Sequence, residues 1–453
     1  MPELPLTLYR AAWVLPACGD PIRDGAVLVG TDGLIAAVGP ATAIEPPPGA
    51  VVDDLGMAAL MPGLVNVHAH PELAMFRGAL EDLNFRDWIL RLVGAKRAAL
   101  TEADFHAAAR WTMVEALRSG ITTLAATESS GASAAALCET GLRGVVFQEV
   151  FGPDPAQVEE SMAGLREAVD CLRGWECDRV RIGVSPHAPY TVSDELFRAA
   201  GEYAVAEGLP MAVHASESRI EQLLVRDGEG DFAPGLRARG IATPPRGRST
   251  IEMLDRLGVL RARPLLIHCV LLDDDDIRRV ADSGSAVAHC PVANARLGHG
   301  VAPYVEMRAA QVRVGLGTDS VGSNNRLDLM EEARIASIVH RARLARSDLM
   351  PPADLLRLCT IDGAEALGMG GLIGTLEPGK AADLCAVSLA APHARPVHDP
   401  LATVFHSARG CDVILTAVQG QVLYRDGKLA TIDPEPLDAA MTDAAARLRE
   451  AMT

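Results

Sequence analysis

Lysine is scarce in this chain of 453 residues, and its distribution is uneven. Only Lys96, Lys380 and Lys428 are present, so arginine supplies nearly all of the positive charge. Acidic residues outnumber basic ones, and the formal net charge is −17 at pH 7. A protein of this charge repels phosphate backbones, which argues against nucleic-acid binding. The charge leaves open which small molecule the protein acts on.

Paired cysteines and long apolar segments are also missing. The nine cysteines are odd in number and scattered, with no Cys-x-x-Cys pair. This pattern is typical of mostly buried free thiols in a reducing compartment, and it excludes a disulfide framework. The first residues lack a basic stretch followed by a long apolar run, and no window approaches the length of a membrane span. We therefore expect a cytoplasmic protein without a membrane partner.

Short strands separated by turn residues are expected at both ends of the chain. Residues 26–29 and 34–38 flank Thr31-Asp32-Gly33, which is a hairpin signal. The same kind of pattern recurs near the C-terminus, at residues 383–387, 413–418 and 421–424. Neither region is large enough to bury a core alone. We expect both to pair into one small β-sandwich domain.

Strands and helices alternate between these two regions. The eight strand candidates are the run that ends at His68 and residues 121–126, 144–148, 180–184, 210–213, 265–267, 286–288 and 312–316. Helical patterns lie between them, at residues 102–119, 156–172, 193–207, 249–257 and 273–283. Eight β-then-α units favour an α/β fold with a (β/α)₈ TIM-type barrel. A doubly wound sheet is the alternative, weakened because polar residues follow strands all along the series.

The predicted division of the chain has four parts. Residues 1–61 and 373–430 form the small β-domain, residues 62–372 form the barrel, and residues 431–453 form a C-terminal helix. Residues 218–250 are one long insertion with loop residues such as Asp227-Gly228-Glu229-Gly230. A loop of this length at the active face of a barrel is usually a lid or a specificity element. A tolerated surface excursion is the alternative.

Two histidines close the first barrel strand. The segment Pro62-Gly63-Leu64-Val65-Asn66-Val67-His68-Ala69-His70 is an apolar run of strand type that ends in this pair. Positions i and i+2 of a strand lie on the same face, so both imidazoles can point at one spot. An isolated pair of this kind is more often a surface feature. Here it predicts half of a metal site, because matching residues recur downstream.

These matching residues follow other strands of the series. His214 and Glu217 come after the fifth strand, His268 after the sixth and Asp319 after the eighth. The carboxyl ends of barrel strands lie on one face, where active sites are built. Three or four nitrogen and oxygen ligands with an open position describe a catalytic zinc or iron site.

Together the motifs resemble the amidohydrolase superfamily. The resemblance rests on PGLVNVHAH, HASE, His268, GTDS and the late segment LEPGKAADL, and it runs from about residue 25 to 430. Within that superfamily the chain is similar to the branch of S-adenosylhomocysteine/methylthioadenosine deaminases, aminodeoxyfutalosine deaminases and triazine hydrolases. SPHAPY at 185–190, Asn294 with Leu297-Gly298, and the run from Thr318 to Asn325 match that branch.

The resemblance implies a role for each of these residues. It implies four metal ligands, which are His68, His70, His214 and Asp319. It implies that His268 contacts the attacking hydroxide or the oxygen of the tetrahedral intermediate, and that Glu217 is the proton shuttle. Trp88 and His187 are expected in the substrate pocket.

The number of metal ions follows from a missing lysine. Many binuclear relatives bridge two metals with a carboxylated lysine after the fourth strand. Here that strand leads into Ser185-Pro186-His187, and no lysine lies between Lys96 and Lys380. We therefore expect one divalent metal per chain, with zinc in first place and iron as the alternative. A metal lowers the pKa of bound water and so supplies a strong nucleophile at neutral pH.

The predicted reaction is hydrolytic deamination of an adenine-type nucleoside with a 5′ extension. Arg246 and Arg248 in the insertion are candidate partners for a substrate carboxylate, which ranks aminodeoxyfutalosine before S-adenosylhomocysteine and methylthioadenosine. The alternatives are a triazine or other aminated-heterocycle hydrolase of the same fold, and a binding protein on an inactive barrel. The predicted partner is a small molecule, and the sequence leaves open whether chains associate into a homo-oligomer.

Overall fold

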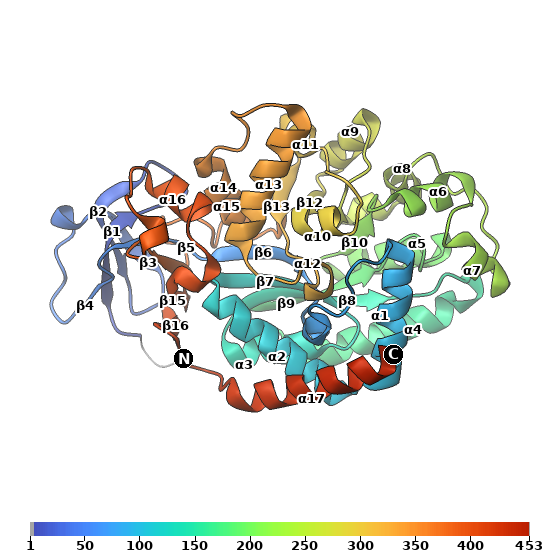
Figure 1. Ribbon diagram of the computed structural model, residues 1–453, viewed down its shortest axis with the longest axis horizontal. Coiled ribbons are helices and arrows are strands. Elements are labelled where there is room, and N and C mark those ends of the chain that lie inside the picture. The colour runs from blue at the N-terminus through green and yellow to red at the C-terminus, as the bar shows by residue number, and fades with distance from the viewer. Residues whose placement is uncertain (1–3, 453) are drawn as a thin grey trace.

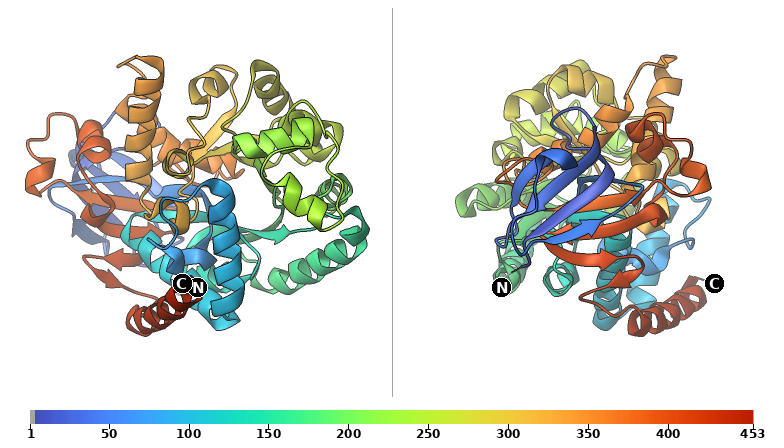
Figure 2. Two further views of the ribbon diagram at one scale, coloured as in Figure 1. Left: turned by 45° about the vertical axis from the view of Figure 1, so that its right-hand side comes forward. Right: turned by 90° about the vertical axis from the view of Figure 1, so that its left-hand side faces the viewer.

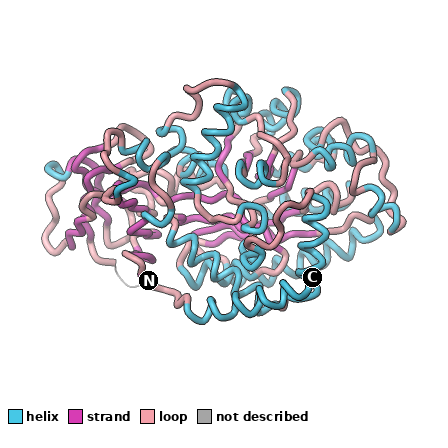
Figure 3. Tube along the Cα trace, viewed as in Figure 1, coloured by secondary structure: helices cyan, strands magenta, loops and turns pink. Residues whose placement is uncertain are grey.

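Strands from both ends of the chain lie together in one sheet at one end of the molecule. The computed structural model describes residues 4–452. Figure 1 shows this sheet on the left, in blue and red, beside a larger body of alternating strands and helices. Figure 3 shows the same division, with helices covering the strands of the body on its outside. The expected pairing of the two terminal regions is confirmed.

The terminal sheet has nine strands, in the order β17-β16-β15-β14-β5-β1-β2-β3, with β4 paired to β1. Its strands are β1 (Thr7–Val14), β2 (Ile22–Val29), β3 (Ile35–Pro40), β4 (Val51–Asp54), β5 (Ala58–Pro62), β14 (Leu384–Ser388), β15 (Val413–Val418), β16 (Gln421–Arg425) and β17 (Lys428–Leu429). The antiparallel pair β5–β14 joins the N-terminal half to the C-terminal half. The hydrogen-bonded path is continuous, so both ends of the chain contribute to one sheet, and the predicted small β-sandwich domain stays a prediction.

The body contains the eight expected parallel strands. They are β6 (Leu64–Ala69), β7 (Ile121–Glu128), β8 (Arg143–Val150), β9 (Val180–Pro186), β10 (Ala212–Ala215), β11 (Leu265–His268), β12 (Ala286–His289) and β13 (Arg313–Leu316). They form two four-stranded sheets, β6–β9 and β10–β13. Single parallel bridges join the sheets at both seams, Val184 with Met211 and Ala69 with Asp319. The carboxyl ends of all eight strands therefore share one face.

Helices connect these strands as the sequence predicts. Their bounds are α1 (Phe85–Ala99), α2 (Glu102–Arg118), α3 (Ala132–Thr140), α4 (Val158–Leu172), α5 (Asp194–Glu207), α6 (Arg219–Asp227), α7 (Ala233–Ala238), α8 (Thr250–Arg256), α9 (Asp274–Ser283), α10 (Pro291–Arg296), α11 (Tyr304–Ala309), α12 (Val321–Asn324), α13 (Leu329–Leu344), α14 (Pro352–Cys359), α15 (Ile361–Ala366), α16 (Pro400–His406) and α17 (Glu435–Met452). In α4 the buried side chains are Met162, Leu165, Val169 and Leu172, the spacing of one helical face.

The insertion differs from the predicted loop, because it contains the helices α6 and α7. Helix α6 begins at Ser218, whose hydroxyl accepts the backbone N–H of Glu221, and it ends at Gly228 in a left-handed conformation. Leu224 and Val225 are buried on its inner face. Gly228, which suggested a loop, therefore ends a helix. The apolar residues Leu224 and Val225 before it indicate that helix, and the prediction did not use them.

The C-terminal helix α17 packs against α1 and α2, as the left view of Figure 2 shows along the lower edge of the molecule. Arg447 of α17 donates to Asp104 at 2.6 Å and to the carbonyl of Ala99 at 3.2 Å.

Among residues 4–452, none of the helices combines the length and the apolar character needed to cross a membrane. All nine cysteines are free thiols, but the expectation that most are buried is wrong, because only Cys269, Cys290, Cys359 and Cys385 are.

Gly63 is the single residue between β5 of the terminal sheet and β6 of the body. An added Cβ at this position would lie 2.1 Å from the hydroxyl oxygen of Thr122, so the close approach of the chains requires glycine. The predicted domain boundary at residue 62 stays a prediction, but it falls at this junction.

Gly63→Ala should lower the free energy of unfolding by about 1–3 kcal/mol, because the core must shift to admit the methyl group. Gly164→Ala is the control, since nothing lies within 4 Å of its Cβ. Gly164 is in α4, where alanine should be neutral or stabilising. Denaturant titration of both variants measures the difference, and an unchanged Gly63→Ala protein would contradict the packing argument.

Candidate metal centre and active site

The two histidines after the first barrel strand point to one spot, as predicted. His68 is the fifth residue of β6, and His70 follows one residue after the strand ends. The ring centroids of His68 and His70 are 4.8 Å apart. Both Nε2 atoms approach the same oxygen, Oδ1 of Asp319, at 3.3 and 3.5 Å. Thr127 Oγ1 lies 3.2 Å from the other nitrogen of His68 and fixes the ring.

Two further imidazoles come from the ends of β10 and β11. The ring of His214 lies 5.1 Å from that of His68 and 5.4 Å from that of His70. Its Nδ1 donates to the carbonyl oxygen of His187 at 3.2 Å, which leaves Nε2 as the free nitrogen. His268 lies 5.6 Å from His214, and its Nδ1 is 2.9 Å from Oδ1 of Asn294.

Asp319 is brought to these histidines by the seam between the last and first strands. Its backbone N–H donates to the carbonyl of His68 at 3.0 Å, and the hydroxyl of Ser323 donates to Oδ2 at 2.8 Å. Asp319 and His268 have φ values of +57° and +72°, which are unusual for residues other than glycine. Strained backbone of this kind collects at functional sites, where neighbouring contacts maintain it.

The ionisation of this cluster favours cation binding. Burial lowers the pKa of His68 to about 4 and also lowers the pKa of His70. Burial alone would raise the pKa of the Asp319 carboxyl, but the adjacent imidazoles of His68, His268 and His70 lower it well below its usual value. Neutral imidazoles beside an ionised carboxylate are the forms that ligate metals. Nε2 of His68 is buried and has no hydrogen-bond partner, so a cation at this point would satisfy it.

Two sets of side chains could therefore hold a metal at this point. One is His68, His70 and His214, and the other is His68, His268 and Asp319. His68 belongs to both sets, so the two sets describe a single candidate centre. A third set, Glu149, His187 and His214, shares His214 with the first. His214 has only one free nitrogen, so it cannot serve both the first and the third set.

Glu217 lies at the edge of the centre, in the turn that follows β10. Its Oε1 is 3.5 Å from Nε2 of His268 and 3.3 Å from Nε2 of His299. The hydroxyl of Tyr190 donates to Oε2 at 3.4 Å. Burial raises the pKa of Glu217, but His268 and His299 outweigh it, so the pKa ends below its usual value. The predicted catalytic carboxyl and His268 are brought together with the candidate ligands, while His299 was not foreseen.

Trp88 contacts the segment that follows Asp319, and His187 lies beside His214. The indole N–H of Trp88 donates to the carbonyl of Gly322 at 3.3 Å, three residues beyond Asp319. His187 stands 4.7 Å from His214, ring to ring, and its Nδ1 is 2.7 Å from the hydroxyl of Thr191. Their roles toward a substrate stay predictions.

Aromatic side chains that the sequence reading missed surround these residues. Phe85 of α1 lies 6.1 Å from Tyr190 and 6.1 Å from Phe232, and the rings of Tyr190 and Phe232 stack at 4.4 Å. Phe232 precedes α7, so the insertion contributes to the wall, as expected for a specificity element. The three aromatic residues come from segments far apart in the sequence, and no local pattern could have grouped them.

Buried acidic groups flank the other side of the histidines. Glu72 pairs with Lys96, and the backbone N–H of Ser130 donates to it at 3.0 Å. Glu149 has no bonded partner for its buried Oε1, which lies 3.8 Å from Nε2 of His187. Burial raises the pKa values of Glu128 and Glu149 to about 8, so both are largely protonated at neutral pH. Lys96 is thus paired with Glu72 and is not among the candidate metal ligands.

The two arginines of the insertion have partners within the chain. Arg246 donates to Asp194 at 2.6 Å and to the carbonyl of Val192 at 3.0 Å. Arg248 pairs with Asp273 and Asp276. Their contact with a substrate stays an untested prediction, but these bonds assign both side chains to holding the insertion against α5 and α9.

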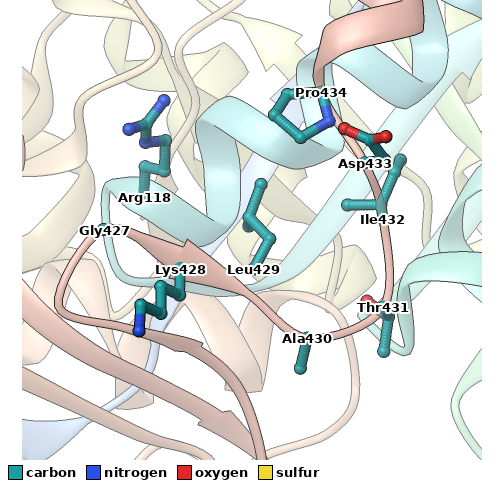
Figure 4. Close-up of a pocket in the computed structure, with 9 residues that line it drawn as sticks. All are labelled: Arg118, Gly427, Lys428, Leu429, Ala430, Thr431, Ile432, Asp433 and Pro434. Carbon is teal, nitrogen blue, oxygen red and sulfur yellow. The ribbon is translucent and has the colours of Figure 1, made fainter.

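A surface hollow of about 610 Å³ lies elsewhere, at the terminal sheet. Figure 4 shows it between Arg118 of α2 and the segment from Gly427 to Pro434. None of the candidate ligands lines it, and it has no part in the centre described above.

Comparison with known proteins agrees with this arrangement. The model of the amidohydrolase family matches residues 59–423. A 5-methylthioadenosine/S-adenosylhomocysteine deaminase of Moorella thermoacetica is 33% identical over 439 residues, covering 96% of this chain and 98% of that protein. A 5'-deoxyadenosine deaminase of Methanosarcina mazei is 31% identical over 435 residues, covering 94% and 95%.

A solved structure gives the same result in three dimensions. An adenosine deaminase from Xanthomonas campestris with bound zinc superposes with a TM-score of 0.87 at 28% identity, covering 99% of this chain and 100% of that one. The match of the family model extends over most of the chain and includes every strand that contributes to the centre. This chain therefore belongs to the amidohydrolase family.

Proposed function

We propose that this chain is a metal-dependent deaminase of adenine-type nucleosides, which converts them to their inosine counterparts and releases ammonia. The observation that carries the proposal is the place of Glu217. A buried, ionised carboxylate lies beside the candidate ligand set and contacts His268 at 3.5 Å. Deamination of an adenine ring needs such a group, because a ring nitrogen and then the leaving amine must each receive a proton.

The proposed cofactor is one divalent metal, zinc in first place, held by His68, His70, His214 and Asp319 on a (β/α)₈ barrel. When bound, it supplies a water molecule of lowered pKa for attack on the amino-bearing carbon. The bonding of His214 supports a single centre, since its Nδ1 donates to His187 and only Nε2 is free. The pairing of Lys96 with Glu72 agrees, because this lysine is not placed to bridge two metals.

The side chains of this pocket divide the proton transfers between them. Asp319, held by Ser323, is placed to accept a proton as water attacks. The attacking water supplies both protons that are needed: Glu217 accepts one and passes it to the ring nitrogen, and the other, held at Asp319, reaches the leaving amine by way of Glu217. A triazine hydrolase remains the alternative, but a carboxylic acid at this point favours a ring that must be protonated.

The substrate is proposed to be an adenine nucleoside with a neutral or apolar 5′ position. The wall formed by Phe85, Tyr190 and Phe232 offers apolar surface. The arginines that would have received a carboxylate are bonded to acidic groups of the chain itself. This removes the reason for ranking aminodeoxyfutalosine first, and it places 5′-deoxyadenosine and methylthioadenosine ahead of the carboxylate-bearing nucleosides.

Removal of the metal should abolish ammonia release and leave most of the fold intact, because the ligands lie at the rim of the strands. Dialysis against a chelator followed by activity assay and far-ultraviolet circular dichroism tests this. Added zinc should restore activity, and elemental analysis of the purified protein should find about one zinc or iron per chain. Full activity in metal-free protein would refute the mechanism, and two metals per chain would refute the single centre.

Glu217→Gln should lower kcat by about 10²–10⁴-fold, because the amide cannot carry protons to the ring and the amine. Metal content should not change. Glu195→Gln, on the exposed side of α5, is the matched control and should behave as wild type. Wild-type turnover in Glu217→Gln would remove its assignment as proton shuttle, whereas loss of metal would make it a ligand or the support of one.

The nucleoside ranking is tested by measuring kcat/KM side by side for 5′-deoxyadenosine, methylthioadenosine, S-adenosylhomocysteine and aminodeoxyfutalosine. The first two should give the higher values, because Arg246 and Arg248 are already paired with acidic groups of the chain. A preference of tenfold or more for aminodeoxyfutalosine would contradict the ranking.

Arg246→Ala should lower the free energy of unfolding by about 1–3 kcal/mol, because it removes the closer of two arginine donors to Asp194 and leaves the carbonyls of Pro189 and Val192 without their side-chain donor. All four nucleosides should then be affected alike. Arg239→Ala, exposed at the end of α7, is the control and should be neutral. A loss confined to carboxylate-bearing substrates, at unchanged stability, would restore Arg246 as a substrate contact.

A further inference from the structure

His299 is a buried histidine that faces the carboxylate of Glu217. Its side chain is 4% exposed, and Nε2 lies 3.3 Å from Oε1 of Glu217. This distance is long for a hydrogen bond, but catalytic hydrogen bonds often tighten only when substrate is present. Nε2 of His299 is a buried atom with no other bonded partner. The carboxylate is therefore the one group in the described structure that can satisfy it.

The backbone around His299 fixes where the ring can go. Its N–H donates to the carbonyl of Asn294 at 2.8 Å. Gly298 and Gly300 on either side have φ values of +72° and +109°, a conformation that other residues rarely adopt. The ring then stands edge-on to Phe85 of α1, with centroids 4.5 Å apart. A short loop after α10 thus directs one imidazole to Glu217.

His268 also approaches Glu217, but the bonding of its other nitrogen limits what it can offer. With the amide oriented as in the structure, Nδ1 of His268 donates to Oδ1 of Asn294 at 2.9 Å. When His268 carries a single N–H, the bond to Asn294 uses it, and Nε2 of His268 then presents a lone pair. It cannot donate to the ionised carboxylate and is left free for the attacking oxygen. The donor to Oε1 must come from His299.

Asn294 therefore holds both imidazoles in different ways. Its side chain sets the tautomer of His268, and its backbone carbonyl anchors His299. On the opposite side of the carboxylate, the hydroxyl of Tyr190 approaches Oε2 at 3.4 Å. Each oxygen of Glu217 thus has a donor that belongs to a different loop.

We propose that His299 is a positioning residue for the proton shuttle, whose Nε2–H holds Oε1 of Glu217 in place to accept a proton. The proposal rests on the proposed function, because it gives Glu217 its shuttle role. It adds a residue that acts on the substrate only through Glu217. Replacing His299 should therefore lower kcat with little change in KM.

The test replaces the donor in two ways. His299→Leu removes it and should lower kcat by about 10–100-fold, the range for a hydrogen bond to a charged group, while KM changes less than about threefold. His299→Gln keeps an N–H near the position of Nε2 and should recover most of this loss. His398→Leu, at an exposed position of the C-terminal region, controls for a histidine-to-leucine change and should match wild type. If the His299→Leu protein does not fold, His299→Ala takes its place in the test.

Crystal structures of the zinc-loaded variants give a readout that does not depend on activity. Glu217 should leave its place against His268 in His299→Leu and keep it in His299→Gln. Unchanged kcat in His299→Leu, or an unmoved Glu217, would overturn the proposal. An equal loss in both variants with Glu217 in place would do the same. If wild-type protein deaminates no nucleoside, the proposed function fails, and the position of Glu217 in the two structures still decides the role of His299.

Discussion

The contact between the last and the first strand of the series also assembles the candidate metal centre. The seam between the last and the first strand is held by the bridge between Ala69 and Asp319, and the N–H of Asp319 donates to the carbonyl of His68. This bond places a carboxylate against two imidazoles in a buried space. Lone pairs and an ionised oxygen brought together out of water destabilise one another unless a cation satisfies them. The rest of the body keeps these groups from moving apart.

The features that the sequence predicted are those set by local periodicity. A strand with period two places His68 and His70 on one face, and eight β-then-α units put His214, His268 and Asp319 at the same rim. These assignments needed no knowledge of which helix packs on which. Helix α6 was within reach of the same reasoning, since its buried positions follow the helical period, but the glycines and charged residues after it dominated the interpretation.

Other parts of the site depend on contacts between distant segments, and the sequence could not supply them. Arg246 pairs with a residue 52 positions away and Arg248 with one 25 positions away. The sequence around each arginine therefore gave no sign of its partner, and both were predicted to be available to a substrate. His299 lay beside the Leu297-Gly298 pair that the resemblance used, yet its direction is set by backbone angles at Gly298 and Gly300. Phe85 reaches it only because α1 is held in place, with α17 packed along its outer side.

The carboxyl groups around the candidate centre differ in pKa because the charged groups beside them differ. Asp319 and Glu217 contact histidine nitrogens, and their pKa values end below the usual range despite burial. Glu128 and Glu149 are equally buried, but Glu72 adds a like charge, so burial dominates and their pKa values rise to about 8. Buried carboxyl groups are therefore ionised at Asp319 and Glu217 but largely neutral at Glu128 and Glu149. This division keeps negative charge where a cation and a proton are handled, and it limits the charge that the pocket presents to the rest of a neutral nucleoside.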